Sequence, residues 1–98
     1  MPALTTKQIS VHRKGVRAWS INAKTIRRTF KFEGFLESIG FVKQVATKAQ
    51  KLNHHPDIDI RFNKVTLTLT THDEGGLTEK DFLMARQCDK DFSKYTAS

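Results

Sequence analysis

The sequence predicts an α+β domain whose elements follow in the order helix, strand, strand, helix, strand, strand, helix. Two patterns carry this prediction: a helical periodicity over residues 33–53 and a period of two over residues 58–69. Strand pairs joined by short turns favour an antiparallel sheet that helices cover on one side and leave open on the other. A chain of 98 residues builds one hydrophobic core, so we predict a single domain over residues 1–98.

Positive charge is concentrated at the N-terminal end. Residues 1–32 hold eight Lys and Arg and no Asp or Glu, whereas residues 33–98 hold nine basic and ten acidic side chains. A basic stretch can meet nucleic acid, an anionic protein or an acidic ligand, or it can be a solvated surface. The stretch carries no nucleic-acid-binding motif, so direct nucleic-acid binding is not favoured.

The sequence also indicates the cellular compartment of the protein. No apolar run approaches the roughly 20 residues of a membrane helix, and the first fifteen residues lack the apolar stretch of a signal peptide. The one cysteine, Cys88, cannot form an intramolecular disulfide, which agrees with a reducing compartment. We expect a soluble cytoplasmic protein, with the nucleus as the alternative.

The N-terminal third predicts a short helix followed by two short strands. Thr5 or Thr6 can cap a helix through residues 7–11, and Gly15 can end it. Apolar residues on either side of the turn Asn22-Ala23-Lys24 predict strands over residues 19–21 and 26–32. We expect Trp19, the large aromatic residue at the head of the first strand, in the core.

Residues 33–53 predict a long helix with a wide buried face. At 100° per residue, one stripe is formed by Phe35, Ile39, Val42, Ala46 and Ala49, and the adjacent side by Phe41, Val45 and Leu52. Pro56 cannot continue a helix and pushes His55 towards extended backbone, so the helix ends close to Asn53 or His54.

The next stretch predicts a β-hairpin. Ile58, Ile60 and Phe62 alternate with polar residues, Asn63-Lys64 forms a two-residue turn, and Val65, Leu67 and Leu69 alternate with threonines. The apolar face is expected to pack on the long helix. The threonines mark a polar outer face; they are Thr66, Thr68, Thr70 and Thr71.

The C-terminal part predicts a loop and a final helix. Asp73-Glu74-Gly75-Gly76 is typical of a loop, and Thr78 can cap a helix in which Asp81 occupies the first turn. There a carboxylate interacts favourably with the helix dipole. An apolar stripe at three- and four-residue spacing packs on the sheet or on another subunit; it contains Ala85, Cys88, Phe92 and Tyr95.

Three of the four histidines lie within nineteen positions. His54 and His55 fall at the end of the long helix, and His72 falls at the end of the second hairpin strand. The topology brings these ends together, so we predict a pocket for acid/base chemistry between them and the Gly75-Gly76 loop. The histidines can also be plain polar surface, or zinc ligands. Zinc is disfavoured because adjacent histidines at a helix end rarely point at one centre.

The segments that contain these residues resemble the pterin-4a-carbinolamine dehydratase family, which also includes a dimerisation cofactor of a homeodomain transcription factor. The matching segments are Lys51-Leu52-Asn53-His54-His55-Pro56, Phe62-Asn63-Lys64-Val65, Thr71-His72 and Gly76-Leu77-Thr78-Glu79-Lys80-Asp81. The resemblance implies a four-stranded antiparallel sheet with three helices packed on one face. It also implies a homodimer or homotetramer, a pterin as substrate, and neither a metal nor a further cofactor.

The resemblance implies dehydration of 4a-hydroxytetrahydropterin to quinonoid dihydropterin, which recycles the pterin cofactor of aromatic amino acid hydroxylases. It marks His54, His55 and His72 as catalytic, and we expect proton transfer from His54 and His72 and ligand orientation from His55. It places substrate contacts at Gln50, Asn53, Pro56, Ile58, Thr70, Thr71, Glu74, Lys80 and Asp81. Some relatives are non-catalytic oligomerising modules, either transcriptional coactivators or assembly chaperones, and this is the alternative function.

Three positions depart from the family pattern. Gln50 stands where relatives usually have an acidic residue, Asn53 where aspartate is common, and Ile58 where tryptophan is common. A nearby carboxylate favours imidazolium, so we expect the histidines to be protonated less readily in this chain. Stacking on the ligand is expected to be weaker at Ile58.

Overall fold

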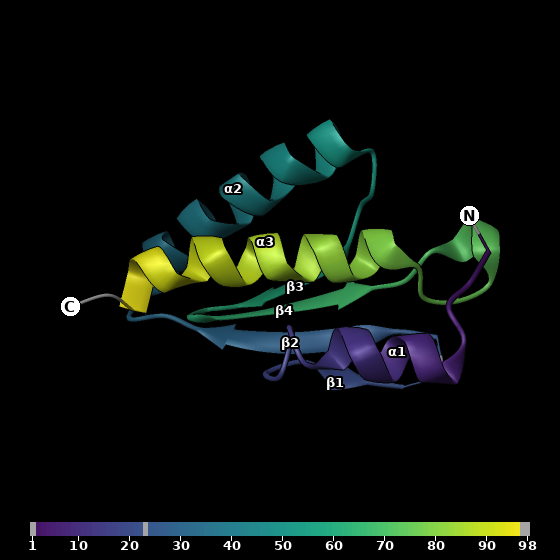
Figure 1. Ribbon diagram of the computed structural model, residues 1–98. Coiled ribbons are helices and arrows are strands. Elements are labelled where there is room, and N and C mark those ends of the chain that lie inside the picture. The colour runs from purple at the N-terminus through teal and green to yellow at the C-terminus, as the bar shows by residue number, and fades with distance from the viewer. Residues whose placement is uncertain (1, 23, 97–98) are drawn as a thin grey trace.

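The computed structural model describes residues 2–22 and 24–96. The helices are α1 (Thr6–Arg13), α2 (Phe35–Leu52) and α3 (Glu79–Thr96), and the strands are β1 (Ser20–Ile21), β2 (Ile26–Lys31), β3 (Asp57–Arg61) and β4 (Lys64–Leu69). A single 3₁₀ turn, η1 (His72–Glu74), lies between β4 and α3. Apart from η1, this is the predicted order of elements (Figure 1).

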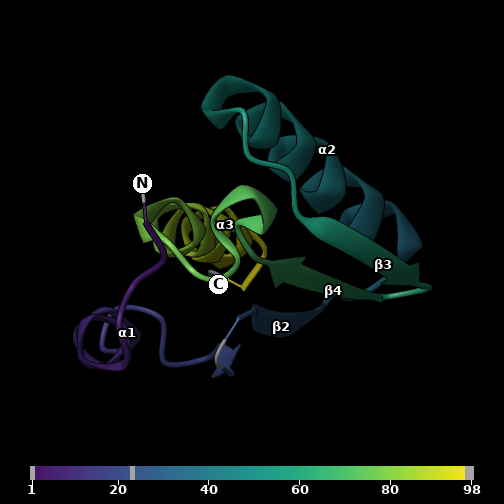
Figure 2. The same ribbon diagram turned by 90° about the vertical axis from the view of Figure 1, so that its right-hand side faces the viewer.

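The strands form one antiparallel sheet in the order β1-β2-β4-β3. The helices α2 and α3 cover one face of the sheet, and α1 lies on the same side, beside the β1 edge (Figure 2). The predicted α+β architecture, with helices on one face and the other face open, is confirmed. β3 and β1 are the two edge strands.

The core lies between the sheet and the two long helices. Trp19 is 5% exposed, and its indole Nε1–H donates to Asp89 Oδ1 at 2.8 Å, so its predicted core position is confirmed. Cys88 is fully buried. Burial, and secondarily the negative charges of Asp91 and Asp89, raise the pKa of the Cys88 thiol to about 12. The thiol therefore stays protonated and acts as a packing group.

The long helix forms where predicted, but it is rotated relative to the predicted stripe. The buried residues of α2 are Ser38, Phe41, Val45 and Ala49. Phe35 and Ile39, which we expected to be buried, are 50% and 39% exposed. The helical period fixes which residues share a face, but the neighbours decide which face is covered. Here α2 packs on α3 and β4.

The hairpin confirms one apolar strand and corrects the other. Val65, Leu67 and Leu69 of β4 are fully buried, whereas Ile58 and Ile60 of β3 remain 38% and 37% exposed. β4 lies inside the sheet and β3 lies at its edge, so the helices cover only β4 completely.

The hairpin turn is shifted by one residue from the prediction. Arg61 pairs with Lys64, so the turn is Phe62-Asn63. Phe62 has a positive φ of 53° and is 66% exposed. Asn63 is held in the turn because its Nδ2 donates to Phe32 O at 3.0 Å and its carbonyl accepts from Phe32 N–H at 2.8 Å.

The N-terminal segment also forms as predicted. Thr5 caps α1 in a reciprocal capping box with Gln8. His12, the fourth histidine, stacks on Phe82 with ring centroids 5.0 Å apart and so has a packing role. Of the predicted turn at residues 22–24, Ala23 lies outside the described residues. None of the helices that the structure describes is both long and apolar enough to cross a membrane.

Candidate functional site

The end of α2 separates the environments of the two adjacent histidines. Asn53 adopts the left-handed conformation, with φ 50° and ψ 45°, which asparagine tolerates better than most residues. The chain turns sharply there, and His54 N–H bonds back to Ala49 O at 3.0 Å. As a result, His54 is only 8% exposed, while His55 is exposed.

A buried carboxylate holds the His54 ring. His54 Nε2 lies 2.5 Å from Asp81 Oδ1, and Asp81 is fully buried. A carboxylate only accepts hydrogen bonds, so Nε2 carries the proton in this pair. Nδ1 is then the ring nitrogen left for a ligand. This arrangement orients an imidazole and fixes its tautomer.

The second oxygen of Asp81 connects the site to the start of α3. Asp81 Oδ2 accepts from Thr78 N–H at 2.9 Å and from Thr71 Oγ1 at 2.8 Å. Lys80 N–H in turn donates to Thr78 Oγ1 at 3.3 Å. Thr78 and Asp81 thus cap the helix reciprocally. The sequence predicted the cap by Thr78, but not the bond from Thr78 N–H to Asp81. The same carboxylate serves a helix start and a site histidine.

His55 has a neutral partner. Its Nε2 lies 2.6 Å from Gln50 Oε1, one turn back on α2. A carboxamide oxygen accepts a hydrogen bond but carries no charge. The two adjacent imidazoles therefore differ in their partners: His54 has a carboxylate and His55 has an amide.

His72 approaches from the sheet side. β4 ends at Leu69, so His72 does not end the strand as predicted but opens η1. Thr71 and Gly76 form a β-bridge, which closes the loop beneath η1. The His72 side chain makes no hydrogen bond to a residue that the structure describes.

The three histidines line one pocket of about 220 Å³. The lining residues are Asn53, His54, His55, Thr70, Thr71, His72 and Asp73. The structure thus brings the three imidazoles into one pocket. Three of the expected substrate-contacting residues line it as well: Asn53, Thr70 and Thr71. The Gly75-Gly76 loop lies outside this lining, in contrast to the prediction.

The other expected substrate contacts lie around the pocket rather than in its wall. Glu74 and Lys80 line an adjoining hollow of about 80 Å³, which shares Thr71 and Asp73 with the pocket. Gln50 and Asp81 reach the site through His55 and His54. Pro56 and Ile58 are not among the lining residues.

Thr70 and Thr71 contribute in a different way from the one expected. We expected both to contact the substrate, but the backbone N–H and C=O of Thr71 bond to Gly76. The hydroxyl of Thr70 donates to Lys24 O at 2.5 Å. The side chain of Thr71 belongs to the Asp81 network.

Sequence reasoning missed two residues of the site, Asp73 and Thr78. Asp73 lines the histidine pocket, but in the sequence it looks like any polar loop residue. Thr78 was predicted as a helix cap, and its second role is visible only through the 2.8 Å contact of its hydroxyl with Thr71 Oγ1. Within the described part of the chain, no three His, Cys, Asp or Glu side chains are grouped closely enough to hold a metal ion.

Comparison with known proteins gives a consistent result. Residues 2–90 match the family model described as pterin 4 alpha carbinolamine dehydratase. A protein of Acidobacterium capsulatum is 48% identical over 85 residues, which cover 87% of this chain and 92% of that protein. One from Chloroflexus aurantiacus is 48% identical over 90 residues, covering 92% and 97%. Both carry the provisional name pterin-4-alpha-carbinolamine dehydratase.

A solved structure matches over nearly the same span. The transcriptional coactivator/pterin dehydratase from Brucella melitensis superimposes with a TM-score of 0.87 at 36% identity, covering 91% of this chain and 97% of that one. The match of the family model, the identities and the shared fold lead to one conclusion: this chain belongs to the pterin 4 alpha carbinolamine dehydratase family.

Proposed function

We propose that the protein dehydrates 4a-hydroxytetrahydropterin to quinonoid dihydropterin and so recycles the pterin cofactor of aromatic amino acid hydroxylases. The observation that carries the proposal is the pocket in which three imidazoles meet, one of them fixed by a buried carboxylate. Membership of the family supports the substrate class.

The reaction needs only two proton transfers. An acid protonates the 4a-hydroxyl, the C4a–O bond breaks and water leaves. A base removes the proton from N5, and its bonding electrons form the C4a=N5 double bond. Imidazole serves both steps near neutral pH, and each such transfer typically contributes roughly 10²- to 10⁴-fold in rate. The proposed chemistry therefore requires no metal and no redox cofactor.

We assign the acid role to His54 and the base role to His72. A positive charge on the His54 ring lies opposite the Asp81 carboxylate, which stabilises it through a charge-assisted hydrogen bond. His72 stands on the sheet-side wall without a hydrogen-bonded carboxylate among the described residues, so its neutral form is free to accept a proton. His55, tethered to Gln50, orients the ligand together with Asn53.

Removing either proton-transfer histidine is expected to lower activity. We expect His54→Ala and His72→Ala each to reduce kcat/KM by roughly 10²-fold or more. The measurement mixes the protein with freshly generated 4a-hydroxytetrahydropterin and follows dehydration spectroscopically. His12→Ala, which changes a histidine outside the pocket, is the control. A wild-type rate no faster than the spontaneous reaction contradicts the proposal.

Asp81 is expected to act as a positioning residue. Asp81→Asn keeps the shape but removes the charge that faces His54, so we expect kcat to fall roughly 10- to 100-fold, the cost of one lost charged hydrogen bond. KM should change much less, and the acid limb of the pH–rate profile should move. Asp91→Asn is the matched control, because it removes the charge of another buried carboxylate of α3 that pairs with Lys48 outside the pocket. An equal loss of kcat in the two variants would show that Asp81 has only a structural role.

A carboxylate introduced at position 50 is expected to act on His55. In Gln50→Glu a carboxylate replaces the amide that contacts His55 Nε2, so the ring should be protonated to a higher pH. Two-dimensional NMR of the imidazole resonances measures this directly, and we expect kcat/KM to change by about threefold or less. Thr47→Glu adds the same charge to an exposed position of α2. A His55 titration that responds equally to both variants would show a general charge effect.

We further propose that the protein is a homo-oligomer. α2 begins at the end of the molecule where β3 turns into β4 (Figure 1). Large apolar side chains are exposed on these elements: Phe35, Leu36, Ile39, Ile58, Ile60 and Phe62. β3 is an edge strand whose residues are all exposed, and exposed apolar edges are sites of association. Oligomerisation also agrees with the second candidate function, a non-catalytic binding module, which the coactivator name of the Brucella relative suggests.

Light scattering coupled to size exclusion tests the assembly. We expect a mass of at least twice the 11.2 kDa of one chain. Leu36→Glu and Ile60→Lys place charges in the apolar surface and should shift the mass towards the monomer. Val11→Glu changes an equally apolar residue on α1 that is 63% exposed, and it should leave the mass unchanged. A wild-type protein that remains monomeric at about 100 μM, a concentration at which even weak dimers form, refutes the assembly.

A further inference from the structure

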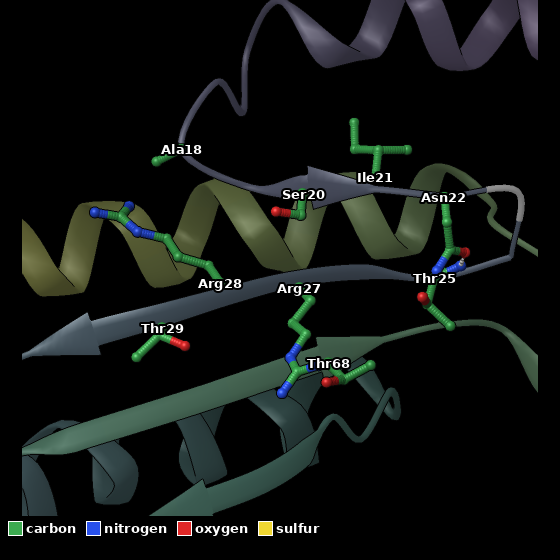
Figure 3. Close-up of a pocket in the computed structure, with 9 residues that line it drawn as sticks. All are labelled: Ala18, Ser20, Ile21, Asn22, Thr25, Arg27, Arg28, Thr29 and Thr68. Carbon is green, nitrogen blue, oxygen red and sulfur yellow. Dashed lines mark hydrogen bonds between the residues drawn. The ribbon is translucent and has the colours of Figure 1, made fainter.

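The open side of the molecule contains a groove remote from the histidines. It has a volume of about 660 Å³ and runs along β1 and β2. Figure 3 shows Arg27 and Thr29 of β2 projecting to the same side as Thr68 of β4, whereas Arg28 projects to the other side. Arg28 is neutralised by Asp89 at 2.6 Å.

The groove opens onto a strand edge that is only partly paired. β1 pairs with β2 at Ile26 and Arg27 alone, although β2 continues to Lys31. Phe32 N–H donates towards β4, to Asn63 O. Backbone groups alternate between the two sides of a strand, so Thr29 and Lys31 direct their N–H and C=O towards the outer side. There they meet no strand in the described chain.

The side chains beside this edge are cationic. Arg27 and Lys31 are exposed on the open face, and Lys64, directly opposite Lys31 in β4, is exposed as well. Like charges at opposed positions destabilise a sheet. None of these three side chains forms an ion pair with a described residue. An anion placed between them would relieve the repulsion.

We propose that the outer edge of β2 binds an extended acidic segment of a partner protein, which adds as a strand beside Thr29 and Lys31. A carboxylate on the open face of such a segment would lie beside Lys31 and diagonal to Arg27, with Lys64 one strand further in, because alternate residues share one face of a strand. The described open face has no aromatic side chain on which unpaired bases could stack, which favours a peptide over single-stranded nucleic acid. A second copy that pairs through the same edge is disfavoured, because it would bring the exposed Arg27 and Lys31 of both chains together.

The test uses a fluorescein-labelled peptide of four Glu-Val repeats and follows its anisotropy with the full-length protein. We expect binding that weakens with salt, and about tenfold weaker binding for Arg27→Glu or Lys31→Glu. A Gln-Val repeat is the neutral control peptide. Lys7→Glu, on exposed α1, is the control variant and should bind like the wild type.

A backbone variant separates strand addition from simple charge attraction. Thr29→Pro removes an outward N–H that the fold itself does not need, and proline is tolerated at strand edges. We expect it to abolish peptide binding, while Thr29→Val, which keeps the N–H, retains binding. A thermal melt of each variant confirms folding. If Thr29→Pro is unfolded, hydrogen exchange of the Thr29 and Lys31 amides in the wild type replaces it, and slower exchange with the peptide is expected.

Several outcomes overturn the proposal. The first is the absence of binding up to roughly 1 mM peptide. The second is that the Gln-Val repeat binds as tightly as the Glu-Val repeat, and the third is that Thr29→Pro binds the peptide like the wild type. Tighter binding of a polyuridylate strand assigns the surface to nucleic acid instead. A change in oligomeric mass in Thr29→Pro assigns the edge to a second copy. Dehydratase activity is expected to be unaffected by Lys31→Glu, so the result is independent of the proposed reaction.

Discussion

The carboxylate of Asp81 connects the fold to the site. It is fully buried and accepts hydrogen bonds from three places in the chain: His54 after α2, Thr71 after β4 and the backbone of Thr78 before α3. A buried carboxylate is stable only when its oxygens are hydrogen-bonded. Removing one donor leaves a buried oxygen without a partner, which lowers the stability of the fold. The three segments are therefore held together by the same group that orients the imidazole.

This arrangement places the candidate site and the surfaces proposed for association at different parts of the molecule. The end of α2, the end of β4 and the start of α3 meet around Asp81 and form the pocket. The start of α2 and the edge strand β3 instead expose apolar side chains. The outer edge of β2 is different again, since cations flank it. The small domain thus offers a polar pocket, an apolar edge and a basic edge.

The sequence predicted the elements well because their signals are local. Period-two alternation identified β3 and β4, and a proline at position 56 fixed the end of α2. The sequence could not predict features that depend on residues distant in the chain. The covered face of α2 is set by α3 and β4. Phe62 enters the turn because Asn63 bonds to Phe32. The three histidines were singled out by their spacing, and the substrate contacts came from the family resemblance. The partner of His54 lies 27 positions away, and sequence spacing does not show that contact.

The difference between the partners of His54 and His55 gives a physical reason for dividing their roles. If both adjacent imidazoles faced carboxylates, both would be drawn towards the charged form, and like charges on neighbouring rings repel. In this chain the His54 ring faces the buried carboxylate of Asp81, while the His55 ring faces the uncharged amide of Gln50. The proposed reaction both gives and takes a proton, and such a reaction needs groups in opposite protonation states. This difference in partners supports the proposed assignment, in which His54 gives the proton and His72, with no hydrogen-bonded carboxylate among the described residues, accepts one.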